Sequence, residues 1–90
     1  MFTYSESLKR YKKEVKEKGL SDVVLKLDLV KDYRGDVNIG ISLEVEGKEN
    51  YFKVKKVLEE LRKKYKSLRG NFWGGYYEDG KKVVDWWGTD

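Results

Sequence analysis

The most constraining feature of this 90-residue chain is a strict alternation of side chains between residues 36 and 47. Its apolar members are Val37, Ile39, Ile41, Leu43 and Val45. Polar or small residues fill the positions between them. A period of two places the two sets on opposite faces of an extended chain. The pattern therefore predicts a central β-strand with one face on a hydrophobic core.

Two amphipathic helices are predicted, one before and one after this strand in the sequence. They cover residues 5–18 and 51–68, where apolar residues recur at steps of three and four. The two stripes are Tyr4, Leu8, Tyr11 and Val15, and Val54, Val57, Leu58, Leu61, Tyr65 and Leu68. The expected N-caps are Ser5 and Asn50, and the expected C-terminal glycines are Gly19 and Gly70.

A β-hairpin is predicted after the first helix. It joins residues 23–31 to the central strand through the three-residue loop Tyr33-Arg34-Gly35, with Gly35 in the left-handed conformation. In this register every apolar residue faces another on the same side of the sheet. The expected pairs are Leu29 with Ile39, Leu27 with Ile41, Leu25 with Leu43, and Val23 with Val45.

A second hairpin is predicted over residues 71–87, with its turn at Glu78-Asp79-Gly80. A two-residue loop would pair Trp73 with Trp86, whereas a three-residue loop would pair Phe72 with Trp86. The three-residue loop is preferred because it gathers apolar residues on one face. That face would hold Phe72, Tyr76, Val84 and Trp86, and the other Trp73, Tyr77, Val83, Asp85 and Trp87. A bulge at Gly74-Gly75 would shift this phase.

The predicted fold is a single α+β domain over residues 1–90 with the element order αββαββ. We expect two layers, with both helices on one face of a four-stranded antiparallel sheet of order 3-4-2-1. This arrangement is similar to a circularly permuted ferredoxin-like fold. The alternative order, with the first strand in the centre, resembles the homing endonucleases, but the acidic helix motif of that family is missing.

Composition excludes several kinds of chemistry. The chain has no Cys, no His and no Pro, so it lacks a thiol nucleophile and the commonest general base and metal ligands. We therefore expect no enzymatic activity, no cofactor and no metal. No signal peptide or membrane-spanning run is recognised, and a soluble protein is expected.

Charge is distributed unevenly along the chain. Residues 5–18 carry a net charge of +3 and residues 50–69 carry +6, whereas all other residues together carry −5. The predicted helices are therefore basic, which suits either a solvated surface or a nucleic-acid interface.

Three patterns are weighed as functional sites. Glu44 and Glu46 share one face of the central strand, but solvated carboxylates explain them sufficiently. Arg34-Gly35-Asp36 spells an integrin-binding tripeptide, yet a hairpin tip needs its glycine. Six aromatic residues crowd the second hairpin: Phe72, Trp73, Tyr76, Tyr77, Trp86 and Trp87. They could stack nucleic-acid bases, but shielding of bare glycine backbone is preferred, with Trp73 or Trp87 over Gly40.

In style, the whole chain resembles de novo designed α+β proteins. Regular Lys/Glu-rich helices such as Val57–Tyr65, glycine-closed loops and the missing Cys, His and Pro carry this resemblance. It implies a stable monomeric scaffold with no evolved catalytic or ligand-binding function and no partner. The alternative is a small basic nucleic-acid-binding module of archaeal or viral type.

Overall fold

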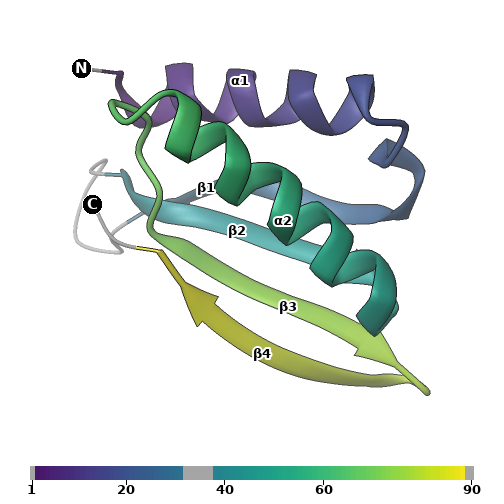
Figure 1. The fold of residues 1–90 in the computed structure, drawn as a ribbon. Helices are drawn as coiled ribbons and strands as arrows, with labels where there is room; N and C mark the ends of the chain where they lie inside the picture. The colour runs from purple at the N-terminus through teal and green to yellow at the C-terminus, as the bar shows by residue number, and fades with distance from the viewer. Residues whose placement is uncertain (1, 32–37, 89–90) are drawn as a thin grey trace.

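A computed structural model describes residues 2–31 and 38–88, except for the side chain of Asn38. The helices are α1 (Tyr4–Glu17) and α2 (Lys48–Lys64), with a short 3-10 helix at Ser21–Val23. The strands are β1 (Val24–Lys31), β2 (Asn38–Glu46), β3 (Phe72–Glu78) and β4 (Lys81–Trp87). Both helices lie on one face of a four-stranded sheet (Figure 1). The predicted α+β class and αββαββ order are confirmed.

The strand order differs from the prediction. The sheet has the order β1-β2-β3-β4, and β2 and β3 run parallel, whereas both hairpins are antiparallel. The all-antiparallel 3-4-2-1 order was therefore wrong, and so was the alternative with the first strand in the centre. The permuted ferredoxin-like topology depended on the 3-4-2-1 order. In its place, α2 makes a crossover connection between two adjacent parallel strands.

Side-chain chemistry explains why β3 rather than β4 is central. The first six residues of β3, Phe72–Tyr77, carry no charge, and most of them are buried. By contrast, β4 carries Lys81, Lys82 and Asp85, and charges on an edge strand discourage pairing with other chains. A strand hydrogen-bonded on both sides is the better place for the uncharged sequence.

Both helices begin earlier than predicted. Thr3, not Ser5, caps α1: its Oγ1 accepts the Glu6 N–H, and the Glu6 carboxylate accepts the Thr3 N–H. Gly47 with φ 85° precedes α2, and Asn50 lies inside the helix, where its amide donates to the Glu46 carbonyl.

The predicted C-terminal end is confirmed for α1 but was wrong for α2. Gly19 has φ 72° and ends α1, as predicted. However, α2 ends at Lys64 rather than at Leu68, so Gly70 does not terminate it. Leu68 is still buried, because the linker after α2 packs across the start of α1, where the Arg69 N–H donates to Ser7 Oγ.

The first hairpin keeps apolar residues opposite each other but in a shifted register. Leu27 pairs with Leu43 and Leu29 with Ile41, each two positions from the prediction. An irregularity between Val24 and Lys26 leaves Leu25 exposed. The predicted loop Tyr33-Arg34-Gly35 and the conformation of Gly35 lie outside the described residues.

The second hairpin adopts the register that was not preferred. Trp73 pairs with Trp86, and Glu78 pairs with Lys81 across a two-residue turn. Asp79 and Gly80 have φ 52° and 77°, the positive values that a type I′ turn requires. Phe72 and Tyr76 face the core as predicted, but on β4 the inward residues are Val83, Asp85 and Trp87 rather than Val84 and Trp86.

The core lies between the sheet and the two helices. Its helical members include Leu8, Tyr11 and Val15 of α1 and Val54, Leu58 and Leu61 of α2, which confirms the main stripes. Contacts join α1 to β1 and β2, and α2 to β2 and β3. Strand β4 therefore lies at the edge of the area of the sheet that the two helices cover (Figure 1). No helix of the described residues lies on the opposite face of the sheet, which is called the outer face below.

Candidate functional site

The two carboxylates of β2 lie in different surroundings. Glu44 accepts hydrogen bonds from the Tyr77 hydroxyl and from Lys82 Nζ, both at 3.2 Å. Burial acts to raise the pKa of Glu44, but the hydrogen bonds from Lys82 and Tyr77, together with the positive charges of Lys82 and Lys26, lower that pKa below its ordinary value. Glu46 is exposed to solvent. Glu44 therefore joins β2 to the second hairpin as a charged carboxylate.

Metal binding was a second possible role for these carboxylates. The described residues contain no group of three or more side chains of the kinds that hold a metal ion. The tripeptide Arg34-Gly35-Asp36 lies outside the described residues.

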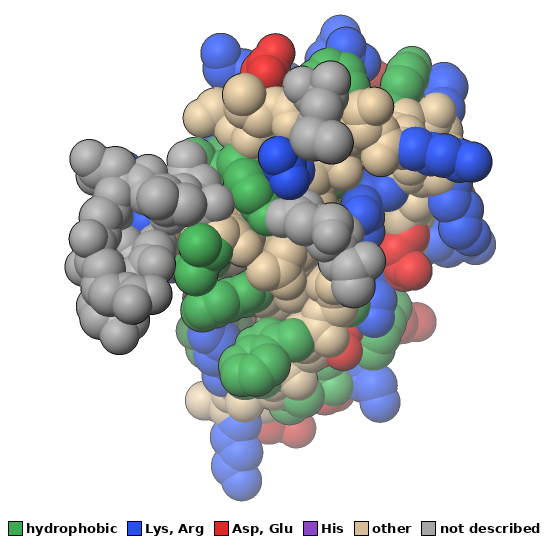
Figure 2. Space-filling view, turned by 90° about the vertical axis from the view of Figure 1, so that its left-hand side faces the viewer, with side chains coloured by type: hydrophobic (Ala, Val, Ile, Leu, Met, Phe, Trp, Pro, Cys, Tyr) green, Lys and Arg blue, Asp and Glu red, His purple; other side chains and the backbone are tan. Residues whose placement is uncertain are grey.

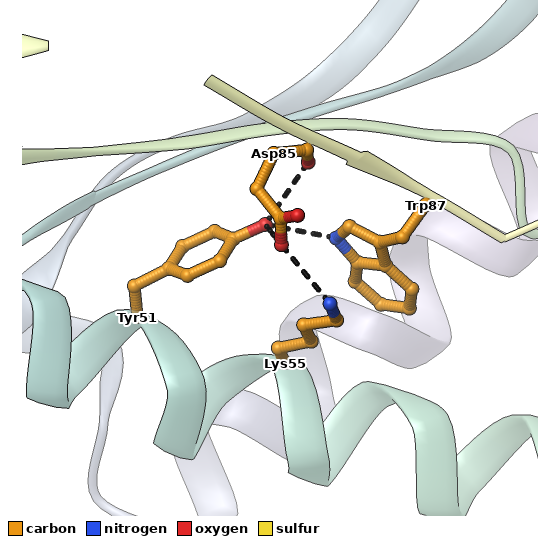
Figure 3. Close-up of polar contacts among 4 residues, drawn as sticks. All are labelled: Tyr51, Lys55, Asp85 and Trp87. Atoms are coloured by element: carbon orange, nitrogen blue, oxygen red, sulfur yellow. Dashed lines mark hydrogen bonds and ion pairs between the residues drawn. The ribbon is translucent and has the colours of Figure 1, made fainter. Parts of the chain in front are cut away.

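A polar cluster between α2 and β4 was missed by the sequence analysis (Figure 3). The hydroxyl of Tyr51 donates to Asp85 Oδ2 and accepts from Trp87 Nε1, both at 2.9 Å. Lys55 Nζ lies 3.0 Å from the same Asp85 oxygen. The Tyr51 hydroxyl rests on the bare backbone of Gly74, because a Cβ there would lie 2.1 Å from it.

The polar groups of this cluster are hydrogen-bond and ion-pair partners of one another. Burial, and then the hydrogen bond and negative charge of Asp85, raise the pKa of Tyr51 well above its ordinary value, so the hydroxyl stays neutral. Asp85 carries two partners, and the Trp87 ring stacks on Phe72 with 4.1 Å between ring centroids. These groups satisfy one another, and they tie the edge strand β4 to α2 at Tyr51, a buried member of the α2 core stripe.

The outer face of the sheet carries exposed aromatic side chains. Trp73 is 42% exposed and Trp86 is 74% exposed, and their ring centroids lie 6.2 Å apart. A Cβ on Gly40 would lie 3.3 Å from Trp73 Nε1, so the predicted shielding of Gly40 is confirmed for Trp73. The alternative shield, Trp87, was wrong, because Trp87 lies on the inner face.

A groove of about 650 Å³ runs between α1 and α2. Its basic residues are Lys9, Arg10, Lys13, Lys18 and Lys64, and its acidic residues are Glu14, Glu17 and Glu60. Arg10 is held by cation–π contacts at 4.9 Å from the Phe2 ring and 5.3 Å from the Tyr65 ring. Within the described residues, the ion pairs are Lys55–Asp85 and Lys82–Glu44, so the groove lysines form none.

The basic side chains gather on the helix side of the molecule. In Figure 2 most of the Lys and Arg side chains lie toward the top and the right, and apolar side chains gather toward the lower left. The segments 5–18 and 50–69, which contain most of both helices and the linker after α2, are called the helix layer below. Their net charges of +3 and +6 contrast with −5 for the rest of the chain.

Neither described helix is long and apolar enough to cross a membrane. Comparison with known protein families, with curated proteins and with solved structures found no match to this chain. The candidate surfaces therefore have to be judged by their own chemistry.

Proposed function

We propose that this chain is a small, non-catalytic module that binds nucleic acid through its helix layer. The observation that carries the proposal is the difference in charge between the helix layer and the rest of the chain. The helix layer has a net charge of +9, from +3 and +6, while the remaining residues have −5. A surface of this kind attracts the phosphate backbone and releases its condensed counterions on binding.

The groove between the helices is the part of the helix layer where we expect the phosphate backbone to bind. Lysines from α1 and α2 line its two sides, and they make no ion pair with the neighbouring carboxylates within the described residues. Their ammonium groups are therefore available to phosphate oxygens. Positioning by phosphate contacts requires no particular base sequence, so binding should be largely independent of sequence.

The side chains that could do chemistry are occupied elsewhere. Tyr51, Lys55 and Asp85 hold β4 on α2, and Glu44 is held by Tyr77 and Lys82. This supports a binding role rather than an enzymatic one.

The test is a pair of variants with equal charge and different location. The groove variant replaces Lys9, Lys13 and Lys64 by Gln, and the control replaces Lys26, Lys31 and Lys81 of the sheet by Gln. All six lysines are exposed, and each variant lowers the net charge from +4 to +1. Fluorescence anisotropy with labelled single- and double-stranded oligonucleotides would be measured at several salt concentrations between about 50 and 200 mM.

We expect wild type and the sheet control to bind with a clear salt dependence. The groove variant should bind more weakly, and its slope of log K against log salt should be smaller by about 2–3, one unit for each lost phosphate contact. Equal weakening by both variants would disprove a localised helix interface. Absence of binding by wild type at low salt would also disprove the proposal, and would favour the scaffold without ligand that the sequence resemblance implied.

A further inference from the structure

We infer that two copies of this chain pair through the outer faces of their sheets. This inference goes beyond the proposed function, and it concerns the face opposite the helix layer. Trp73, Val84 and Trp86 lie on that face with 42%, 56% and 74% of their surface exposed. Large apolar side chains gathered on one uncovered surface mark an interaction site.

The exposed apolar side chains of the outer face come from the neighbouring strands β3 and β4. On the outer face near the two tryptophans, the central strands β2 and β3 carry Gly40, Ser42 and Gly75. All three are buried, although no described helix covers this face. Packed sheets lie about 10 Å apart, so a second sheet would contact the exposed side chains of Trp73, Val84 and Trp86 rather than these buried positions. A two-fold axis would use the same patch twice, which satisfies both copies with one interface.

The charge of the outer face favours a second copy of the chain over a nucleic acid as the molecule that binds there. Among the described strand residues, alternation places the cations Lys26 and Lys82 and the carboxylates Asp28, Glu44 and Glu46 on the outer face. Lys82 and Glu44 already neutralise each other at 3.2 Å. A nearly neutral face gains little from counterion release, so it gives a polyanion no electrostatic advantage.

The same charges decide which faces of two copies can meet. Two helix layers, each with a net charge of +9, repel each other. Two outer faces carry both signs and offer apolar side chains to each other. Pairing through them keeps both helix layers in solvent, which departs from the monomer expected from the sequence.

The test compares adjacent residues of β4 that point to opposite faces. Trp86→Ser and Val84→Ser change the outer face, and Val83→Ser changes a valine that is 40% exposed on the inner face. Sedimentation equilibrium would be run without nucleic acid over a wide range of protein concentration, and far-UV circular dichroism would confirm folding. Oligonucleotide binding would be measured on the same samples.

We expect wild type and Val83→Ser to form the same dimer, and both outer-face variants to weaken it at least tenfold while still binding oligonucleotides. A wild-type protein that stays monomeric at the highest concentration would overturn the inference. So would a dimer that is unaffected by Trp86→Ser and Val84→Ser. Loss of single-stranded oligonucleotide binding in Trp86→Ser would assign the face to stacked bases, and would overturn it as well.

Discussion

The contact between Gly74 and Tyr51 predicts that a single added methyl group will detach β4 from α2. In Gly74→Ala the new Cβ would lie 2.1 Å from the Tyr51 hydroxyl and 2.7 Å from the Asp85 carbonyl oxygen. The tyrosine has to move away from Asp85 and Trp87, which both hydrogen-bond to its hydroxyl. Overpacking and buried polar groups without partners each cost about 1–3 kcal/mol, so the free energy of unfolding should fall by about 2–5 kcal/mol.

A double-mutant cycle separates this mechanism from a general intolerance of alanine. Tyr51→Phe removes the atom that the new methyl group meets first. In that background, Gly74→Ala should cost at least about 1 kcal/mol less than in wild type, as expected for residues in direct contact. The remaining cost comes from the Asp85 carbonyl, which belongs to the backbone and cannot be removed. Urea denaturation followed by circular dichroism measures all four free energies.

Tyr76→Phe provides the matched control. Tyr76 is also buried, and its ring centroid lies 5.4 Å from that of Tyr51, but no hydrogen bond of its hydroxyl occurs in the described part of the chain. Gly74→Ala should cost the same in this background as in wild type. The reasoning fails if the cost in the Tyr51→Phe background agrees with that in wild type within about 0.5 kcal/mol, the usual limit of additivity.

Three further predictions concern the core and pH. Leu61 is 8% exposed, and Leu61→Ala should lower stability by about 2–5 kcal/mol in denaturant titrations; a change below half a kcal/mol would contradict its core position. The lowered pKa of Glu44 stabilises the fold above the ordinary value of 4.5, so the stability difference between wild type and Glu44→Gln should shrink as pH falls below that value. Burial raises the pKa of Tyr11 from 10.0 to about 12, so the fold should lose stability as pH rises through this interval. Spectrophotometric titration should show the delayed ionisation of Tyr11, and a loss of stability just as steep in Tyr11→Phe would refute its role.

The sequence predicted what depends on local periodicity. The alternation of Ile41, Leu43 and Val45 and the helix stripe through Leu58 and Leu61 reached the core as expected. These patterns are set by the geometry of single elements, so the buried face of each element can be predicted without knowing which elements are its neighbours. Strand order is not local. Correct placement of β3 would have required giving more weight to the charges of Lys81, Lys82 and Asp85, which suit an edge.

The register of the second hairpin was predicted wrongly and the polar cluster was missed, and the two errors have a related cause. Counting apolar residues on each face favoured the wrong loop, which placed Asp85 on the face opposite Phe72 and Tyr76. In the structure Asp85 lies on the inner face, where Tyr51 and Lys55 bind its carboxylate. The inward position of this half-buried carboxylate can be explained only when its partner Tyr51, 34 positions away, is known. Asp79-Gly80 was the stronger signal, because that dipeptide favours a two-residue turn.

The parallel ladder between β2 and β3 also determines the order in which the chain can fold. Each hairpin joins neighbouring segments, but every pair in this ladder, from Ile41 with Phe72 to Glu46 with Tyr77, spans 31 residues. Closing so long a connection costs more chain entropy than closing a hairpin, so the ladder should form last and limit the folding rate. Until it forms, the two αββ halves each carry a strand edge open to the wrong partner, and a swapped pairing between two chains competes with correct folding.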